Sequence, residues 1–183
     1  MKINKTAQLI LAVTFAVVIQ LAVAHYDEWL PHSWQTYTAS DRSFSVDLPA
    51  KPTFDTVQAP GAGGMQVSIQ MVTAQPTQDT AYMCSYYDRV DDPESTPQEV
   101  LETSRDGSLN KIQGSLISQK NMTIQGYPAI DVQAHARQDS LVDLRLILVN
   151  KRLFMLMAIA PNGKREPKAV KRFFDSFKLH TQS

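Results

Sequence analysis

Alternating apolar and polar residues run through the middle of the chain and predict an antiparallel β-sheet. The clearest run covers residues 65–71, where the odd-numbered side chains are apolar and the even-numbered ones are Gln66, Ser68 and Gln70. This period of two residues, with one polar face, is typical of a half-buried antiparallel strand. The same pattern, or a β-rich composition, predicts further strands at 34–39, 44–48, 54–58, 81–87, 115–123, 128–136, 141–149 and 153–160.

The strand predicted at 153–160 (LFMLMAIA) is apolar on both faces and therefore belongs at the centre of the sheet. If 128–136 and 141–149 pair so that the paired residue numbers sum to 276, their apolar faces coincide. Asn150 and Lys151 then form a two-residue turn into the central strand. A strand that is buried on both sides needs cover on each face, and in a chain of this size we expect helices to provide it.

Two segments have the signals of helices. Thr96-Pro97-Gln98-Glu99 combines a capping box with a first-turn proline and predicts a helix over 97–113, ended by Gly114. The segment 165–178 carries an amphipathic apolar stripe, made of Val170, Phe173, Phe174 and Phe177. The predicted fold class is α+β, with an antiparallel sheet of about six to nine strands covered by helices.

Residues 1–24 have the pattern of an export signal. Lys2 and Lys5 precede an apolar run over 7–24, which ends in the small-x-small pattern Ala22-Val23-Ala24. Cleavage after Ala24 and retention as an uncleaved anchor are both open, and both place the remaining chain outside the cytoplasm, in the periplasm or secreted. We expect a lead-in at 25–33 and a single domain at 34–183.

Charge and cysteine content narrow the functional classes. Without Lys2 and Lys5 the chain has 16 basic and 18 acidic residues, which argues against nucleic acid as a partner. Cys84 is the single cysteine, so no intramolecular disulfide can form, and we expect it to be a small apolar core residue.

The four histidines are scattered, and we expect no metal and no cofactor. The acidic segment 88–94 is interpreted as a solvated loop and Gly61–Gly64 as a hairpin turn.

Both ends of the predicted domain resemble small exported bacterial domains of the PsbP-like family. The similarity lies in Trp34-x-x-Tyr37 with 44–52 (FSVDLPAKP), in 150–154 (NKRLF) and in 172–178 (RFFDSFK). The resemblance implies an α/β/α sandwich around an antiparallel sheet. Photosynthetic members of this family are extrinsic subunits of photosystem II, others are binding or assembly factors, and many bacterial members have no assigned activity. The family has no common catalytic motif, so the resemblance implies no site residue.

Two groups of residues are candidates for function. Lys168, Lys171 and Arg172 belong to a basic last helix, which we expect to bind a protein partner or an anionic membrane surface unless it is an ordinary solvated face. The 276 pairing also places Asp131 opposite Arg145, with His135 nearby. This polar ladder is either simple cross-strand pairing or the floor of a small polar pocket.

The sequence therefore favours an exported, non-catalytic binding or assembly module with an unidentified partner. The alternative is a small extracytoplasmic hydrolase that uses groups around Asp131, His135 and Arg145. An enzyme would need a deep pocket with converging polar side chains, whereas a binding module would present a filled sandwich with charged faces.

Overall fold

The computed structural model describes residues 33–60, 66–89 and 95–180. The export signal predicted at 1–24 and nearly all of the lead-in lie outside these residues, as do the Gly61–Gly64 turn, Met65 and most of the acidic segment 88–94. Within the described ranges, no helix is both long enough and apolar enough to cross a membrane.

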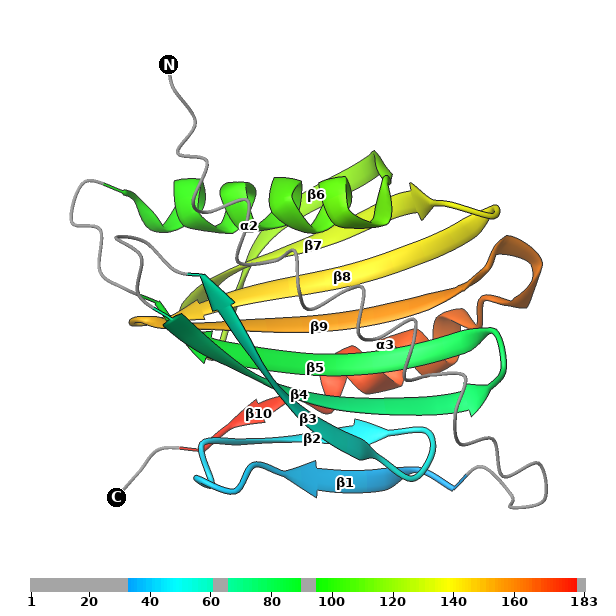
Figure 1. Cartoon of the computed structure of the whole chain (residues 1–183), viewed down its shortest axis with the longest axis horizontal. Helices are drawn as coiled ribbons and strands as arrows, with labels where there is room; N and C mark the ends of the chain where they lie inside the picture. Colours follow the sequence, from blue (N-terminus) through cyan, green and yellow to red (C-terminus); the bar gives the residue numbers. More distant parts are fainter. Residues whose placement is uncertain (1–32, 61–65, 90–94, 181–183) are drawn as a thin grey trace.

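The described chain forms two antiparallel sheets and two α-helices (Figure 1). The elements, in chain order, are β1 (Gln35–Thr38), β2 (Phe44–Leu48), β3 (Thr53–Pro60), β4 (Gln66–Thr77), β5 (Thr80–Asp88), α2 (Pro97–Ile112), β6 (Ser115–Ile124), β7 (Tyr127–Ala136), β8 (Ser140–Val149), β9 (Arg152–Pro161), the short 3-10 helix η2 (Asn162–Lys164), α3 (Pro167–Asp175) and β10 (Lys178–Leu179). The predicted α+β class is confirmed.

The large sheet has seven strands in the order β3-β4-β5-β9-β8-β7-β6, so β9 is its central strand, as its two apolar faces predict. Asp131 pairs with Arg145 and Val132 with Leu144, which confirms the register in which paired numbers sum to 276. Val149 pairs with Arg152 across the predicted two-residue turn, where Asn150 has a φ of 53°.

One face of the large sheet is covered by α2, which packs on β7 and β8. The helix buries seven residues, and three of these are small: Ser104, Gly107 and Ser108. Small side chains let the helix approach the sheet closely. Its apolar residues join one hydrophobic cluster with the facing side chains of β3, β4, β5, β7, β8 and β9.

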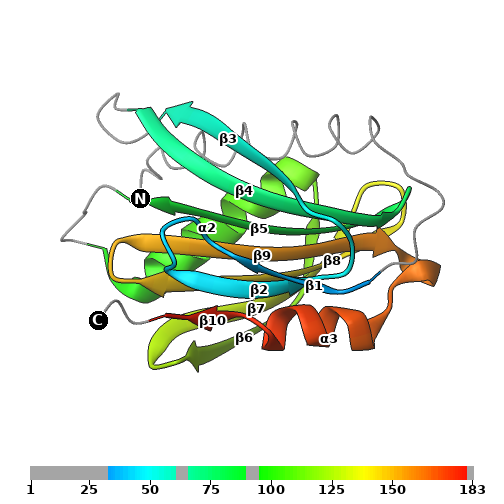
Figure 2. The ribbon, with the colours of Figure 1, turned by 90° about the horizontal axis from the view of Figure 1, so that it is seen from below.

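The opposite face is covered by α3 together with a small sheet in the order β1-β2-β10. Figure 2 shows both in front of the large sheet, with α2 behind it. The prediction that helices cover both faces is therefore right but incomplete, because three short strands cover part of this face together with α3. The small sheet exists because β10, directly after α3, returns to pair with β2.

Phe44 of β2 is the centre of the aromatic packing that joins the small sheet to the rest. Its ring is fully buried and lies 5.2–5.5 Å, between centroids, from the rings of Tyr86, Phe154 and Phe177. These rings come from β5, from β9 and from the segment after α3. The edge-to-face contacts add to the free energy of burying the rings themselves.

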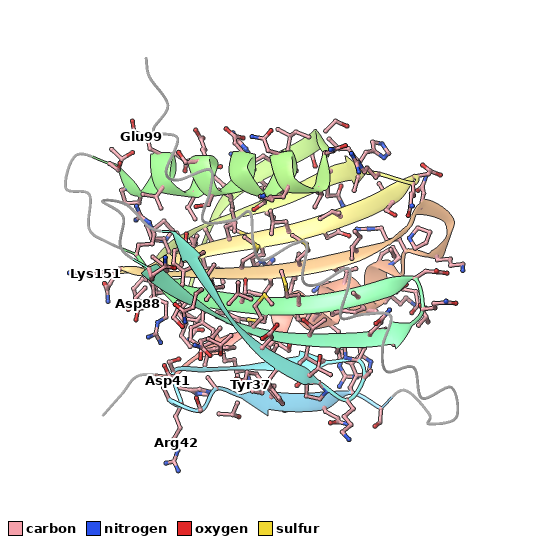
Figure 3. The ribbon with its side chains drawn as sticks, in the orientation of Figure 1. Tyr37, Asp41, Arg42, Asp88, Glu99 and Lys151 are labelled. Carbon is pink, nitrogen blue, oxygen red and sulfur yellow. The ribbon has the colours of Figure 1, made fainter. Side chains whose placement is uncertain are left out.

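Arg152 fixes one end of the small sheet to the large one. Its guanidinium donates two hydrogen bonds to Asp88 (2.7 and 2.9 Å) and one to Asp41 in the β1–β2 turn (2.7 Å). Asp41 and Asp88 lie at the same end of the molecule (Figure 3). The hydrogen bonds from Arg152 hold the pKa of the Asp88 carboxyl below its ordinary value, so both carboxylates are ionised around neutral pH and the contact is intact.

The end of α2 differs by one residue from the prediction. Gln113, not Gly114, adopts the left-handed conformation, with a φ of 48°. Gly114 is needed for a different reason: a Cβ there would lie 2.7 Å from the carbonyl oxygen of His135 and 2.8 Å from the side chain of Ile112. The glycine therefore permits close contact between the end of the helix and β7.

We predict that Gly114→Ala lowers the free energy of unfolding by about 1–3 kcal/mol, because the added methyl group meets backbone that cannot move aside. Gly163→Ala is the matched control, since a Cβ at that position would meet nothing within 4 Å. Urea unfolding of both variants measures the difference, and equal stabilities would contradict the packing assigned to Gly114.

Candidate functional site

A ladder of charged and amide side chains crosses β7 and β8 on the face that α3 covers. Asp131 and Gln133 of β7 lie opposite Arg145 and Asp143 of β8. The same face of the neighbouring strand β9 is apolar, with Phe154, Leu156 and Ala158 in the core cluster beneath α3. The sheet thus changes from apolar to polar within one strand spacing, at the side of α3.

Arg145 is the most constrained member of this ladder, with a side chain that is only 8% exposed. Its guanidinium donates two hydrogen bonds to Asp131 (2.6 and 2.7 Å) and one to the carbonyl of Phe174 (3.1 Å). The Phe174 ring lies 4.7 Å from the guanidinium carbon. Arg145 therefore links the polar strands to α3, and its geometry leaves little freedom.

Asp143 makes the second link between the sheet and the start of α3. Arg165 donates to both of its carboxylate oxygens (2.6 and 2.7 Å), and Gln133 donates to one of them (3.0 Å). The hydrogen bonds that Arg165 donates to Asp143 raise the pKa of Arg165, so its guanidinium stays charged. Two bidentate ion pairs thus lie next to each other.

These side chains form one wall of an open groove of about 480 Å³, which we call the ion-pair groove. It lies between α3 and the strands β6, β7 and β8, and includes Lys120 of β6. Four basic residues (Lys120, Arg145, Arg165, Lys171) and three acidic residues (Asp131, Asp143, Asp175) line it, which leaves a net charge of +1. Lys120 lies opposite Asp131 in the β6–β7 register, but the Asp131 carboxylate binds Arg145. Within the described part of the chain no acidic side chain forms an ion pair with Lys120, so the exposed Lys120 ammonium is the surplus charge.

The structure brings Asp131 and Arg145 together but leaves His135 outside the groove. His135 is exposed further along β7, opposite Leu141. Asp131 and Arg145 bind each other, so both side chains are held in an ion pair. Cys84 is fully buried in β5, and burial raises the pKa of its thiol far above the ordinary value, which keeps it neutral. Among the described residues that line the groove, no histidine accompanies Asp131 and Arg145.

Lys168, Lys171 and Arg172 are all exposed on α3. Lys171 pairs with Asp175 one turn later, while Arg172 lies 4.3 Å from the Trp34 ring and donates to Asp47 at 3.3 Å. Lys164, at the end of η2, contacts Asp79 in the turn between β4 and β5. Most of the positive charge in this region is thus matched locally, and Lys168 is the least engaged of the three.

Comparison with known proteins bears on the fold. No protein-family model and no curated protein matches the chain. The solution structure of cyanobacterial PsbP (CyanoP) from Synechocystis sp. PCC 6803 superposes with a TM-score of 0.52 and 14% identity, over 86% of this chain and 99% of that one. The crystal structure of PA94, a Pseudomonas aeruginosa protein of unknown function, superposes with a TM-score of 0.51 and 8% identity, over 81% of this chain and 99% of that one. The fold is PsbP-like, as the sequence resemblance implies, and at these identities the likeness extends to the fold alone.

We predict that Asp131→Asn lowers the free energy of unfolding by about 2–3 kcal/mol, because it leaves the buried Arg145 cation without its counter-charge. Asp175→Asn is the control, since it breaks the exposed pair with Lys171 and should cost less than about 1 kcal/mol. Urea unfolding at neutral pH measures both. Equal effects would show that Arg145 does not depend on Asp131.

Proposed function

We propose that this protein is an exported, non-catalytic binding or assembly module that docks a protein partner in the ion-pair groove. The observation that carries the proposal is the pair of neighbouring bidentate links, Arg145 to Asp131 and Arg165 to Asp143. They hold the wall of the groove in one shape before any partner arrives. A preorganised surface loses little conformational freedom on binding, which favours affinity.

Export is supported by the sequence pattern of residues 1–24, whether that segment is cleaved or retained. The PsbP-like fold fits the same proposal, because the resemblance noted from the sequence connects such domains with binding and assembly roles. A hydrolase is less well supported, since His135 lies outside the groove and Asp131 is held by Arg145.

A protein partner fits the charge distribution better than a membrane does. Anionic lipid attracts surfaces with several unmatched cations, but Lys171 and Arg172 each have an acidic neighbour. In the groove, the surplus charge is the single ammonium of Lys120. A partner that places one carboxylate beside Lys120, within a largely polar contact, would match this surface.

We predict that Lys120→Glu weakens partner binding at least tenfold, because it replaces the surplus cation of the groove with an anion. Lys168→Glu is the matched control: it makes the same charge change on an exposed face of α3 outside the groove. The tagged full-length protein and both variants are used for affinity capture from the envelope fraction of the source cells, at low and high salt. The wild type and Lys168→Glu should capture one shared protein, and high salt should reduce its recovery.

Loss of capture with Lys168→Glu but not with Lys120→Glu would move the docking surface to the outer face of α3 and contradict the proposal. Co-sedimentation of the wild type with anionic vesicles, abolished by either variant, would identify a membrane as the partner instead. Thermal unfolding of the variants verifies that both retain the fold, which is expected because both lysines are exposed.

A further inference from the structure

A second groove of about 530 Å³ lies at the opposite edge of the same face of the large sheet, between β1 and the edge hairpin β3–β4. We call it the aromatic groove because Tyr37, Phe54 and Tyr86 contribute to its lining. Tyr37 lies between the small sheet and the large one (Figure 3). The volume of the aromatic groove is within the range of about 300–1,000 Å³ that is usual for small-ligand sites.

Phe54 is the unusual residue of this groove. Its side chain is on edge strand β3 and is 63% exposed, the highest value among the large apolar residues that the structure describes. Its ring centroid lies 5.3 Å from that of Tyr37. Exposing so much aromatic surface to water forgoes the free energy of burial, so the ring pair offers a ready surface for a ligand.

Beside the rings, the hairpin presents an array of amide and hydroxyl groups. The register places Thr56 opposite Gln70 and Gln58 opposite Ser68, on the same face as Phe54. Thr56 donates to the Gln70 amide oxygen (2.8 Å), while the amide nitrogens of Gln70 and Gln58 both donate to the Ser68 hydroxyl (3.3 and 3.2 Å). Thr56 and Gln70 line the groove, whereas Gln58 and Ser68 lie beyond its lining. These bonds orient the array and still leave an unused donor on the Gln70 amide.

The aromatic groove is nearly free of charge. Asp55 is the one charged residue among those that line it, and its carboxylate accepts a hydrogen bond from the backbone N–H of Thr56 (2.7 Å). By the alternation of side chains along β3, Asp55 lies on the opposite face from Phe54 and Thr56, and its cross-strand partner is Met71. Such a lining complements a neutral ligand, in contrast to the ion-pair groove.

We propose that the aromatic groove binds a neutral oligosaccharide. A sugar ring has a face of C–H groups, which packs on aromatic rings such as those of Phe54 and Tyr37. Its hydroxyl groups both donate and accept, which matches amides and hydroxyls that offer both functions. This site is separate from the ion-pair groove, and its assignment does not rest on the proposed function.

A proline-rich peptide is the competing ligand for an aromatic-lined groove. Such a peptide lacks N–H donors at its prolines and presents mainly carbonyl acceptors. It would use the rings but leave the acceptors of the groove lining, among them the Thr56 hydroxyl oxygen, without donors. The combination of aromatic rings with side chains that both donate and accept hydrogen bonds therefore favours a saccharide.

The test is calorimetric titration of the full-length protein with three neutral tetrasaccharides: β-1,4-linked N-acetylglucosamine, β-1,4-linked glucose and α-1,4-linked glucose. We expect at least one to bind with a Kd between about 10 μM and 1 mM, as is reasonable for a shallow groove. Phe54→Ala should weaken that binding at least tenfold, and Gln70→Ala severalfold. Leu116→Ala, an exposed apolar residue on the opposite edge strand β6, should leave it unchanged.

The proposal is overturned if none of the three saccharides binds at 5 mM, which is about five times the weakest Kd expected. It is also overturned if Leu116→Ala reduces binding as much as Phe54→Ala does. A proline decamer that binds the wild type in place of the saccharides, and loses affinity with Phe54→Ala, would reassign the groove to a peptide. Thermal unfolding separates these outcomes from loss of fold, which Phe54→Ala should leave intact because the ring is largely exposed.

Discussion

The architecture depends on the burial of the central strand β9 on both of its faces. Leu153, Met155 and Met157 belong to one hydrophobic cluster, and Phe154, Leu156 and Ala158 belong to the other. Each face therefore needs its own layer of cover. A single helix, α2, covers the first face, whereas α3 and the small sheet divide the second between them. The shared cover leaves room on either side, and the two grooves lie there.

The two grooves have opposite chemistry although they belong to the same face of the sheet. The ion-pair groove is lined by charges that bind each other, so the wall that α3 forms with β7 and β8 is fixed by Arg145 and Arg165. The aromatic groove is lined by rings and neutral hydrogen-bonding groups of β1, β3 and β4. The proposed protein partner and the proposed saccharide are thus assigned to opposite edges of one face.

Local pattern in the sequence was sufficient to predict the large sheet. Alternation identified most strands, matched apolar faces gave the register between β7 and β8, and the two apolar faces of 153–160 placed β9 at the centre. The small sheet was not predictable, because a two-residue strand such as β10 has no pattern and is formed by its return to β2. The left-handed residue after α2 is Gln113, and Gly114 is required instead for close packing on β7, which only the folded chain reveals.

The candidate site was predictable as far as cross-strand pairing extends. The register gave the contact between Asp131 and Arg145, but His135 is four residues from Asp131, or about 13 Å along the strand, and lies beyond the groove. Arg165 and Lys120 were missed because they come from elements whose position depends on tertiary packing. Phe54 was seen as part of a strand, and its exposure follows from its place at the sheet edge.

The central claim is that the small sheet is a fixed part of the fold, so that the aromatic groove between β1 and the β3–β4 hairpin keeps its shape. Native-state hydrogen exchange of the full-length protein tests this directly, because it reports the free energy of opening for each amide. If the claim is right, the paired amides of β2 exchange as slowly as those of β9, through global unfolding. If the amides of β2 exchange through a separate opening of much lower free energy, the small sheet detaches on its own and the claim is wrong.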